Sequence, residues 1–175
     1  MVDSIQRGAA SEDLLFKRLV DPTTDDWRAL MALYARTFEA AQRETEDGIV
    51  RNLRTPENHR EGGHVVIAVG TDDRRCLGGI IFSWLSLISC GYVSYVFVEE
   101  TSRRHGLGSQ LLTQMRTYLT EKTCQGSHSV RGVFAEIERP QPDATNQQRM
   151  HFWRRNGVRP LAVEWCYPAL RYKPG

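Results

Sequence analysis

A loop rich in arginine and glycine joins an apolar segment of this chain to an amphipathic one. Residues 103–108 read Arg-Arg-His-Gly-Leu-Gly, between the strand-like residues 92–98 and the helix-like residues 107–122. The first amides of a helix have no acceptor within the helix, and the helix dipole adds partial positive charge there. Glycine lets a phosphate approach the backbone closely, and arginine adds charge beside it. The loop therefore predicts a binding site for a phosphate-bearing ligand.

Two common phosphate-binding loops do not fit this sequence. A Walker loop needs Gly-Lys followed by Ser or Thr at the helix start, and that string is absent here. A dinucleotide fingerprint needs a third glycine where Leu111 stands, within a βαβ repeat that the surrounding sequence lacks. The pattern that remains is Arg-x-x-Gly-x-Gly, beginning at Arg103. Taken alone, this pattern also fits two glycines that only shape a strand-to-helix turn.

The pattern resembles the pyrophosphate loop of the GNAT acetyltransferases, a family that binds coenzyme A. The similarity runs from Val98 to Gly108. It departs at Glu100, where proline is usual in the family, and at Ser102, where an aromatic residue is common.

A second match lies further along the chain, in the order that the family follows. The next helix of the family often reads Asn-x-x-Ala-x-x-x-Tyr-x-x-x-Gly, and Asn146 and Gly157 fit that register. Arg149 takes the place of the small residue, and Trp153 takes the place of the tyrosine. Just before this helix, residues 134–137 (Phe-Ala-Glu-Ile) resemble the Leu-Glu-Val strand of several members.

The resemblance covers residues 14–170 and implies an N-acetyltransferase that uses acetyl-CoA as its cofactor. The acceptor would be a primary amine of a small molecule or of a protein. A backbone N–H near Phe97 and Val98 would polarise the thioester carbonyl. The residues expected to bind the cofactor are Phe97, Val98, Arg103, Arg104, His105, Gly106, Leu107, Gly108, Ser109, Asn146 and Trp153.

Glu136 is the first candidate for the general base. Strand alternation places it on one face with Phe134 and Glu138. It also matches the strand glutamate that serves as base in several relatives. The alternative role is a structural ion pair with Arg149 or Arg154. If Glu136 is structural, His64 is the next candidate, although a lone strand histidine is more often structural too.

The general acid must differ from that of many relatives, which use the helix tyrosine to protonate the departing thiolate. Trp153 stands at this position, and an indole N–H donates a hydrogen bond without being an acid at neutral pH. Tyr167, on a late predicted strand, is the best remaining candidate for a catalytic acid. Tyr95 either faces the acetyl site or belongs to the core.

Apolar periodicity and turn residues predict the elements that position these groups. Helices are expected at residues 25–38, 46–53, 107–122 and 145–155. Strands are expected at residues 14–20, 64–69, 76–85, 92–98, 130–137 and 161–167, with a further short strand near 170–172.

The order of these elements predicts an α/β fold with a mixed α+β sheet and helices on both faces. Short turns at residues 71–73 and 89–91 indicate an antiparallel meander. The strands on either side of the 107–122 helix can be parallel neighbours through a right-handed crossover. The expected result is a GNAT fold with a mostly antiparallel sheet of six or seven strands and one parallel, splayed pair. A single domain would span residues 13–175, after a flexible tail at residues 1–12.

Composition excludes several classes of protein. The chain has 175 residues, 41% hydrophobic, with 23 basic and 21 acidic residues and a net charge of +2, which does not favour nucleic acid. The four cysteines have no metal-type or redox-type spacing, and no metal is expected. The longest apolar stretch, residues 77–88, is too short to span a bilayer. We expect a cytoplasmic protein without a membrane partner, as a monomer or homodimer.

Two other functions stay open at this level. A non-catalytic acyl-CoA-binding module or sensor with the same fold would explain the tryptophan at position 153. An enzyme for another acyl group, such as succinyl or malonyl, would need an arginine near the acyl pocket.

Overall fold

The computed structural model describes residues 14–55, 63–70, 75–124, 129–137 and 144–161. These residues fall into two compact units, which divide after Ile137. The first unit holds the sheet and three of the α-helices, and the second holds one further helix. The predicted strands at 161–167 and near 170–172 lie outside the described residues, apart from Leu161.

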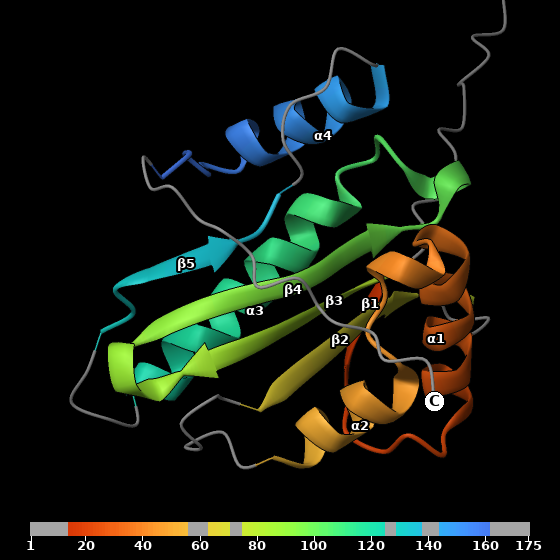
Figure 1. Cartoon of the computed structure of the whole chain (residues 1–175), viewed down its shortest axis with the longest axis horizontal. Coiled ribbons are helices and arrows are strands. Elements are labelled where there is room, and N and C mark those ends of the chain that lie inside the picture. The colour runs from red at the N-terminus through yellow and green to blue at the C-terminus, as the bar shows by residue number, and fades with distance from the viewer. Residues whose placement is uncertain (1–13, 56–62, 71–74, 125–128, 138–143, 162–175) are drawn as a thin grey trace, which may run out of the picture. The chain divides into compact units, whose positions relative to one another are not determined.

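The first unit is built on a mixed sheet whose spatial order follows the sequence, β1-β2-β3-β4-β5 (Figure 1). Its strands are β1 (Leu15–Leu19), β2 (His64–Gly70), β3 (Cys76–Leu85), β4 (Cys90–Val98) and β5 (Gly132–Ala135). The first four strands pair antiparallel, and β5 pairs parallel to β4. The predicted meander and the predicted parallel pair are both confirmed.

Two helices on one face of the sheet begin at threonine caps. In α1 (Asp25–Thr37) the Thr24 side chain accepts the Trp27 N–H, and in α2 (Glu46–Arg54) the Thr45 side chain accepts the Gly48 N–H. Both helices carry two acidic residues in the first turn and arginine in the last, which suits the helix dipole. Their apolar sides bury one core with β2, β3 and β4.

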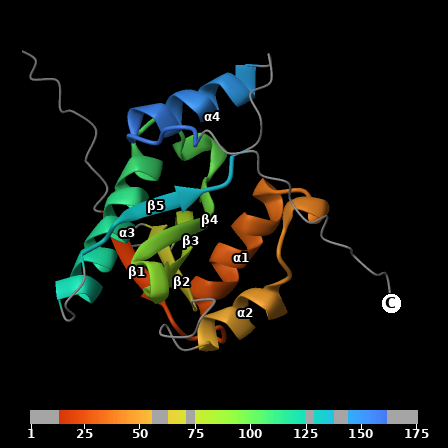
Figure 2. The same cartoon turned by 60° about the vertical axis from the view of Figure 1, so that its left-hand side comes forward.

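The opposite face is covered by α3 (Leu107–Cys124), as Figure 2 shows. Its apolar stripe is fully or nearly fully buried, at Leu107, Leu111, Leu112, Met115 and Leu119. Glycine allows close packing here, because a Cβ at Gly91 would lie 2.6 Å from Cδ1 of Leu119. Tyr118 meets Phe82 of β3 edge to face, with ring centroids 5.5 Å apart. The prediction of helices on both faces is therefore confirmed.

A bulge in β4 sets which side chains share a face at the centre of the sheet. Ile81 of β3 lies opposite Tyr95, and Phe82 lies opposite Val93, so Ser94 is the extra residue. Without the bulge, strand alternation would send Tyr92 and Tyr95 to opposite faces. With it, both face α1 and α2. The same strand loses its parallel partner at this point, because β5 pairs with β4 only from Cys90 to Val93.

The second unit contains α4 (Ala144–Arg155), followed by a glycine stop. Gly157 has φ of +81°, its N–H donates to Arg154 C=O, and Val158 N–H donates to Trp153 C=O. These two bonds make a Schellman cap, which requires the left-handed conformation that glycine adopts at little cost. The predicted helix and its end at Asn156-Gly157 are confirmed.

The α1 cap gives a test of the local structure. Replacing Thr24 by Ala should lower the free energy of unfolding by about 1 kcal/mol, because the Trp27 amide loses its acceptor. Thr24→Ser keeps the oxygen and should cost much less. Urea denaturation of the three proteins measures this, and equal losses for Ala and Ser would show that the hydroxyl is not what stabilises the helix start.

Candidate functional site

The arginine and glycine loop turns sharply through two left-handed residues. Arg104 has φ of +70° and Gly106 has φ of +83°. For Arg104, which carries a Cβ, this conformation costs about 1–2 kcal/mol. A Cβ built on Gly106 would have no heavy atom within 4 Å, so the space in front of this glycine is open. Strain of this kind accumulates at binding sites, where the fold holds the backbone in an unfavourable conformation.

Helix α3 starts directly after Gly106 and directs its first amides out of the loop. The N–H of Gln110 donates to Gly106 C=O at 3.1 Å, which is the first α-helical bond. The earlier amides of Leu107 and Gly108 therefore have no acceptor within the helix. Together with the positive end of the helix dipole, they make a site that suits an anion. Arg103, Arg104 and His105 beside them are predominantly exposed.

Contacts at the end of β4 hold this loop in place. The Arg103 side chain donates from Nε to Val98 C=O at 3.1 Å, and its main-chain N–H donates to Glu100 C=O. A second contact is an ion pair between Arg75, just before β3, and Glu99, with 2.7 Å between the guanidinium nitrogen and the carboxylate oxygen. Charge-assisted bonds of this kind fix geometry as well as adding attraction. The loop is thus anchored at its first residue, while its second and third project to solvent.

Beside the loop, one edge of β4 has no strand partner among the described residues. Pairing with β5 ends at Val93, and β4 continues to Val98. Along that edge, residues 94–98 have no paired strand within the part of the chain that the structure describes. An edge of this kind can bind an extended, amide-bearing chain by main-chain hydrogen bonds. The open edge and the anion site lie at successive positions along one segment.

Glu136 lies where the two parallel strands part. It follows β5 directly, and its Oε1 accepts a hydrogen bond from the Tyr92 hydroxyl at 3.0 Å. The carboxylate is exposed. Tyr92 pairs in register with Phe134, one residue before the parallel ladder ends. The pair therefore places a carboxylate and a phenol next to the point where the unpaired edge of β4 begins.

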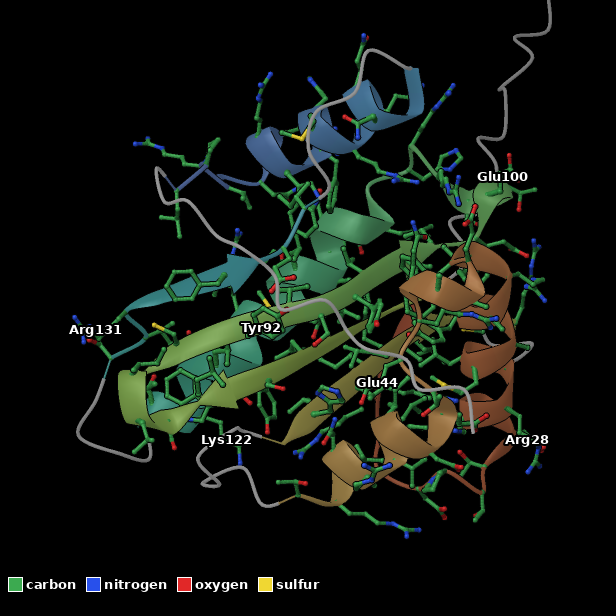
Figure 3. All side chains as sticks on the ribbon, in the orientation of Figure 1. Arg28, Glu44, Tyr92, Glu100, Lys122 and Arg131 are labelled. Carbon is green, nitrogen blue, oxygen red and sulfur yellow. The ribbon has the colours of Figure 1, made fainter. Side chains whose placement is uncertain are left out.

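A row of polar side chains crosses the same face of the sheet. His64, Ser83 and Tyr92 lie opposite one another in register on β2, β3 and β4. Nδ1 of His64 lies 3.0 Å from Oγ of Ser83, and Nε2 lies 3.0 Å from Oε2 of Glu44. The other carboxylate oxygen of Glu44 accepts the side-chain amide of Asn52 at 2.8 Å. The row begins at Asn52 of α2 and ends at the Tyr92–Glu136 pair. Glu44 and Tyr92, two of its members, are labelled in Figure 3.

The main chain of Glu44 holds the segment between α1 and α2 against the sheet. Its N–H donates to the hydroxyls of Tyr34 and Tyr95, at 3.0 and 2.9 Å. The Tyr95 hydroxyl donates in turn to Gln42 C=O at 3.3 Å. The two rings pack on each other and on Phe38, and Phe97 joins the cluster through Tyr34 and Phe38. Burial, and then the Tyr95 hydroxyl beside it, raise the pKa of Tyr34, so this phenol keeps its proton.

The structure brings some of the predicted site residues together. Residues 97–98 and 103–109 lie on one continuous segment, and Glu136 lies at the end of the strand beside β4. Tyr95 is partly buried, and its ring packs on Tyr34 while its hydroxyl accepts the Glu44 N–H, contacts that fit the core role among its two predicted ones. Asn146, 4% exposed, and the half-buried Trp153 belong to the second unit. Tyr167 lies outside the described residues.

The sequence does not predict a specific role for three polar residues of the site. Glu44 is one of several acidic residues in a charged segment, Ser83 lies inside an apolar strand, and Tyr92 lies on a predicted strand. A sequence signal did exist for Ser83, because a polar residue breaks the run Gly-Ile-Ile-Phe-Ser-Trp-Leu at a position where β3 is otherwise buried. Their convergence depends on strand register, which pairs Ser83 with His64 on one side and with Tyr92 on the other.

Among the described residues, no helix has the length and apolar character to cross a membrane. No group of three or more His, Cys, Asp or Glu side chains in the same ranges is placed to hold a metal ion.

Comparison with known families gives a match over most of the chain. The family model described as "Acetyltransferase (GNAT) family" matches residues 27–157. A comparison with curated proteins finds no match.

Solved structures support the same fold at low sequence identity. The aminoglycoside acetyltransferase meta-AAC0020 from an uncultured soil metagenomic sample, in complex with sisomicin, has a TM-score of 0.61 and 18% identity, over 88% of this chain and 95% of that one. AAC(6')-Iy in complex with a bisubstrate analog of coenzyme A has a TM-score of 0.58 and 17% identity, over 89% and 97%. A tandem GNAT protein from the clavulanic acid biosynthesis pathway has a TM-score of 0.62 and 22% identity, over 83% and 43%.

The two left-handed glycines provide a matched test of the loop. Gly106→Ala and Gly157→Ala each add a Cβ that meets no heavy atom within 4 Å, at φ values of +83° and +81°. Each should therefore lose about 1–2 kcal/mol of local stability through backbone strain alone. Only Gly106→Ala should weaken coenzyme A binding, by about tenfold for each 1.4 kcal/mol of loop strain. Calorimetric titration that gives both variants the wild-type affinity would contradict this placement of the anion site.

Proposed function

Because the chain belongs to the GNAT family of acetyltransferases, we propose that it transfers an acetyl group from acetyl-CoA to a primary amine. The observation that supports this most directly is the loop at residues 103–109 beside the open edge of β4. It combines a site for the pyrophosphate with an edge for the extended, amide-bearing arm of coenzyme A.

The residues present fit this cofactor. Gly106 leaves open space where a side chain would block a phosphate, and the α3 amides supply donors. Arg103, Arg104 and His105 are exposed beside them, and we assign phosphate contacts to these three together with residues 106–109. Residues 97 and 98 supply main-chain groups at the unpaired edge. We also assign Asn146 and Trp153 to cofactor binding, on the family register.

The bound thioester would supply the acetyl group in activated form. The chain's own residues have two roles. They hold the acceptor nitrogen beside the unpaired edge of β4, and they accept the protons that it loses. We assign to Glu136 the proton that the nitrogen loses as the C–N bond forms. The Tyr92 hydroxyl, 3.0 Å away, orients that carboxylate. For the proton donor to the departing sulfur we retain Tyr167 as the candidate.

The acceptor is a primary amine of a small molecule or of a protein. Among the similar structures, meta-AAC0020 is described with sisomicin and AAC(6')-Iy with an acetylneamine analog. The molecules bound in those two structures make aminoglycosides the first amines to test, alongside a polyamine and a peptide. They do not exclude a protein acceptor.

A non-catalytic acyl-CoA-binding module is the second candidate. The observation that favours it is Trp153 on α4, at the position where many relatives carry a tyrosine that acts as the general acid. Its ring packs edge to face on Phe152, with centroids 5.0 Å apart, so it also contributes apolar packing to the second unit.

Replacing Glu136 by Gln tests the assigned base. The change keeps the shape and removes the proton acceptor, so turnover should fall by about 100- to 10,000-fold, with a changed pH profile. Glu121→Gln, an exposed carboxylate on α3, is the matched control and should behave as wild type. The measurement is amine-dependent release of free thiol. An unchanged rate and pH profile in Glu136→Gln would make this carboxylate structural.

Replacing Trp153 distinguishes the two candidate functions. In an enzyme, Trp153→Tyr should keep activity, because unassisted departure of a thiol with a pKa near that of cysteine, about 8.5, is feasible. Trp153→Ala should lose cofactor affinity through lost packing. A wild type that releases no thiol, together with an active Trp153→Tyr variant, would support the binding module instead. Calorimetry with coenzyme A and the thiol assay report the two properties separately.

A further inference from the structure

A histidine at the start of β2 belongs to a hydrogen-bonded chain that the steps described so far do not use. Its members are Glu44, His64 and Ser83, joined by contacts of 3.0 Å on each side of the imidazole. Only 10% of the His64 side chain is exposed, and Ser83 is 4% exposed. Buried polar groups need partners, and here each satisfies the next.

A proton relay along this chain needs the imidazole of His64 in its neutral form with the hydrogen on Nε2, since a carboxylate such as that of Glu44 accepts hydrogen bonds. In that tautomer Nε2 donates to Glu44, 3.0 Å away. The other imidazole nitrogen, Nδ1, then has its lone pair directed at the Ser83 hydroxyl, which donates to it. Asn52 donates to the second carboxylate oxygen at 2.8 Å and holds Glu44 in this orientation. Ser83 is left with oxygen lone pairs that can take up another hydrogen.

The chain ends close to the proposed reaction centre. Ser83 lies directly opposite Tyr92 in the β3–β4 register, and such neighbours have Cβ atoms about 4.5–5.5 Å apart. The Tyr92 hydroxyl in turn contacts Glu136. Ser83 therefore lies on the strand next to the tyrosine that contacts Glu136. His64 lies one strand further away, on the side of α2.

Acetylation of an ammonium removes two protons from the nitrogen. One must leave before the nitrogen lone pair can attack, and the second leaves as the C–N bond forms and the C–S bond breaks. At the end one proton is on the released thiol and the other has passed to solvent. Glu136 is assigned to the second, so a group for the first remains to be identified.

We propose that Ser83 and His64 form a relay that takes the first proton from the acceptor ammonium, with Glu44 as the positioning residue for His64. The ammonium gives its proton to Ser83 Oγ as Ser83 gives its own to His64 Nδ1. The imidazolium that results stands against the Glu44 carboxylate, which stabilises the charge. After the product leaves, the proton returns to solvent. This relay rests on the proposed amine acetylation.

A purely structural role is the competing explanation. Glu44 also binds Tyr34 and Tyr95 through its main chain, so His64 would serve only to clamp the segment between α1 and α2. The described groups around the imidazole are Glu44, Asn52 and Ser83. A clamp lowers the rate equally at every pH, whereas a relay matters only while the amine is protonated in solution.

The test compares His64→Gln and Ser83→Ala with wild type and with the Glu121→Gln control. Acceptors are sisomicin, spermidine and a peptide with one free amino group, each with acetyl-CoA and a thiol assay from neutral to alkaline pH. We expect kcat/KM of both variants to fall by about 100-fold or more at neutral pH. The deficit should shrink towards wild type as the pH approaches that at which the amine is neutral. Calorimetric affinity for coenzyme A should stay at the wild-type value.

The outcomes separate the relay from the wider function. A deficit that is constant across the pH range, or absent, overturns the relay and leaves acetylation standing. Loss of folding in His64→Gln, seen as a collapsed thermal transition, moves the decision to Ser83→Ala, which removes a single oxygen. A wild type that binds coenzyme A and acetylates none of the three amines overturns the proposed function, and the relay with it.

Discussion

One irregularity in a single strand determines how the site is built. The extra residue at Ser94 turns the second half of β4, and the parallel ladder with β5 stops at the residue before it. This places Tyr92 on the same face as Tyr95, and among the described residues it leaves residues 94–98 of β4 with an open edge. The strand then runs into a loop that presents helix amides and arginine. A bulge re-aims side chains and ends pairing, and here both effects occur at the point where cofactor and acceptor would meet.

The segment between α1 and α2 depends on the same arrangement. Glu44 is bound through its N–H to two tyrosine hydroxyls and through its carboxylate to His64 and Asn52. One of those tyrosines, Tyr95, faces this segment only because of the bulge. Tyr95 therefore connects the segment between α1 and α2 to β4, and a change in β4 would alter both.

Local signals in the sequence predicted most of the fold. Threonine caps, turn residues and the stripe of α3 lie within short windows, so the helices, the meander and the loop at residues 103–108 could be placed. The polar row could not, because it depends on which residues of β2, β3 and β4 stand opposite one another. A bulge shifts that register by one residue, and the alternation of polar and apolar residues in β4 does not reveal it in advance. Without that register, Ser83 is one polar residue in an apolar strand, and Glu44 is one of several surface charges.

The order of the strands has a consequence for how the chain acquires its structure. Between β2, β3 and β4 each strand pairs with the one just before it across a short connection, whereas the chain passes through the whole of α3 between β4 and β5. Contacts distant in sequence form slowly, since loop closure must precede them. We therefore expect His64, Ser83 and Tyr92 to align early in folding and Glu136 to join them later. Among the described residues the β4–β5 ladder has four pairs, so it is a place where local opening would cost little.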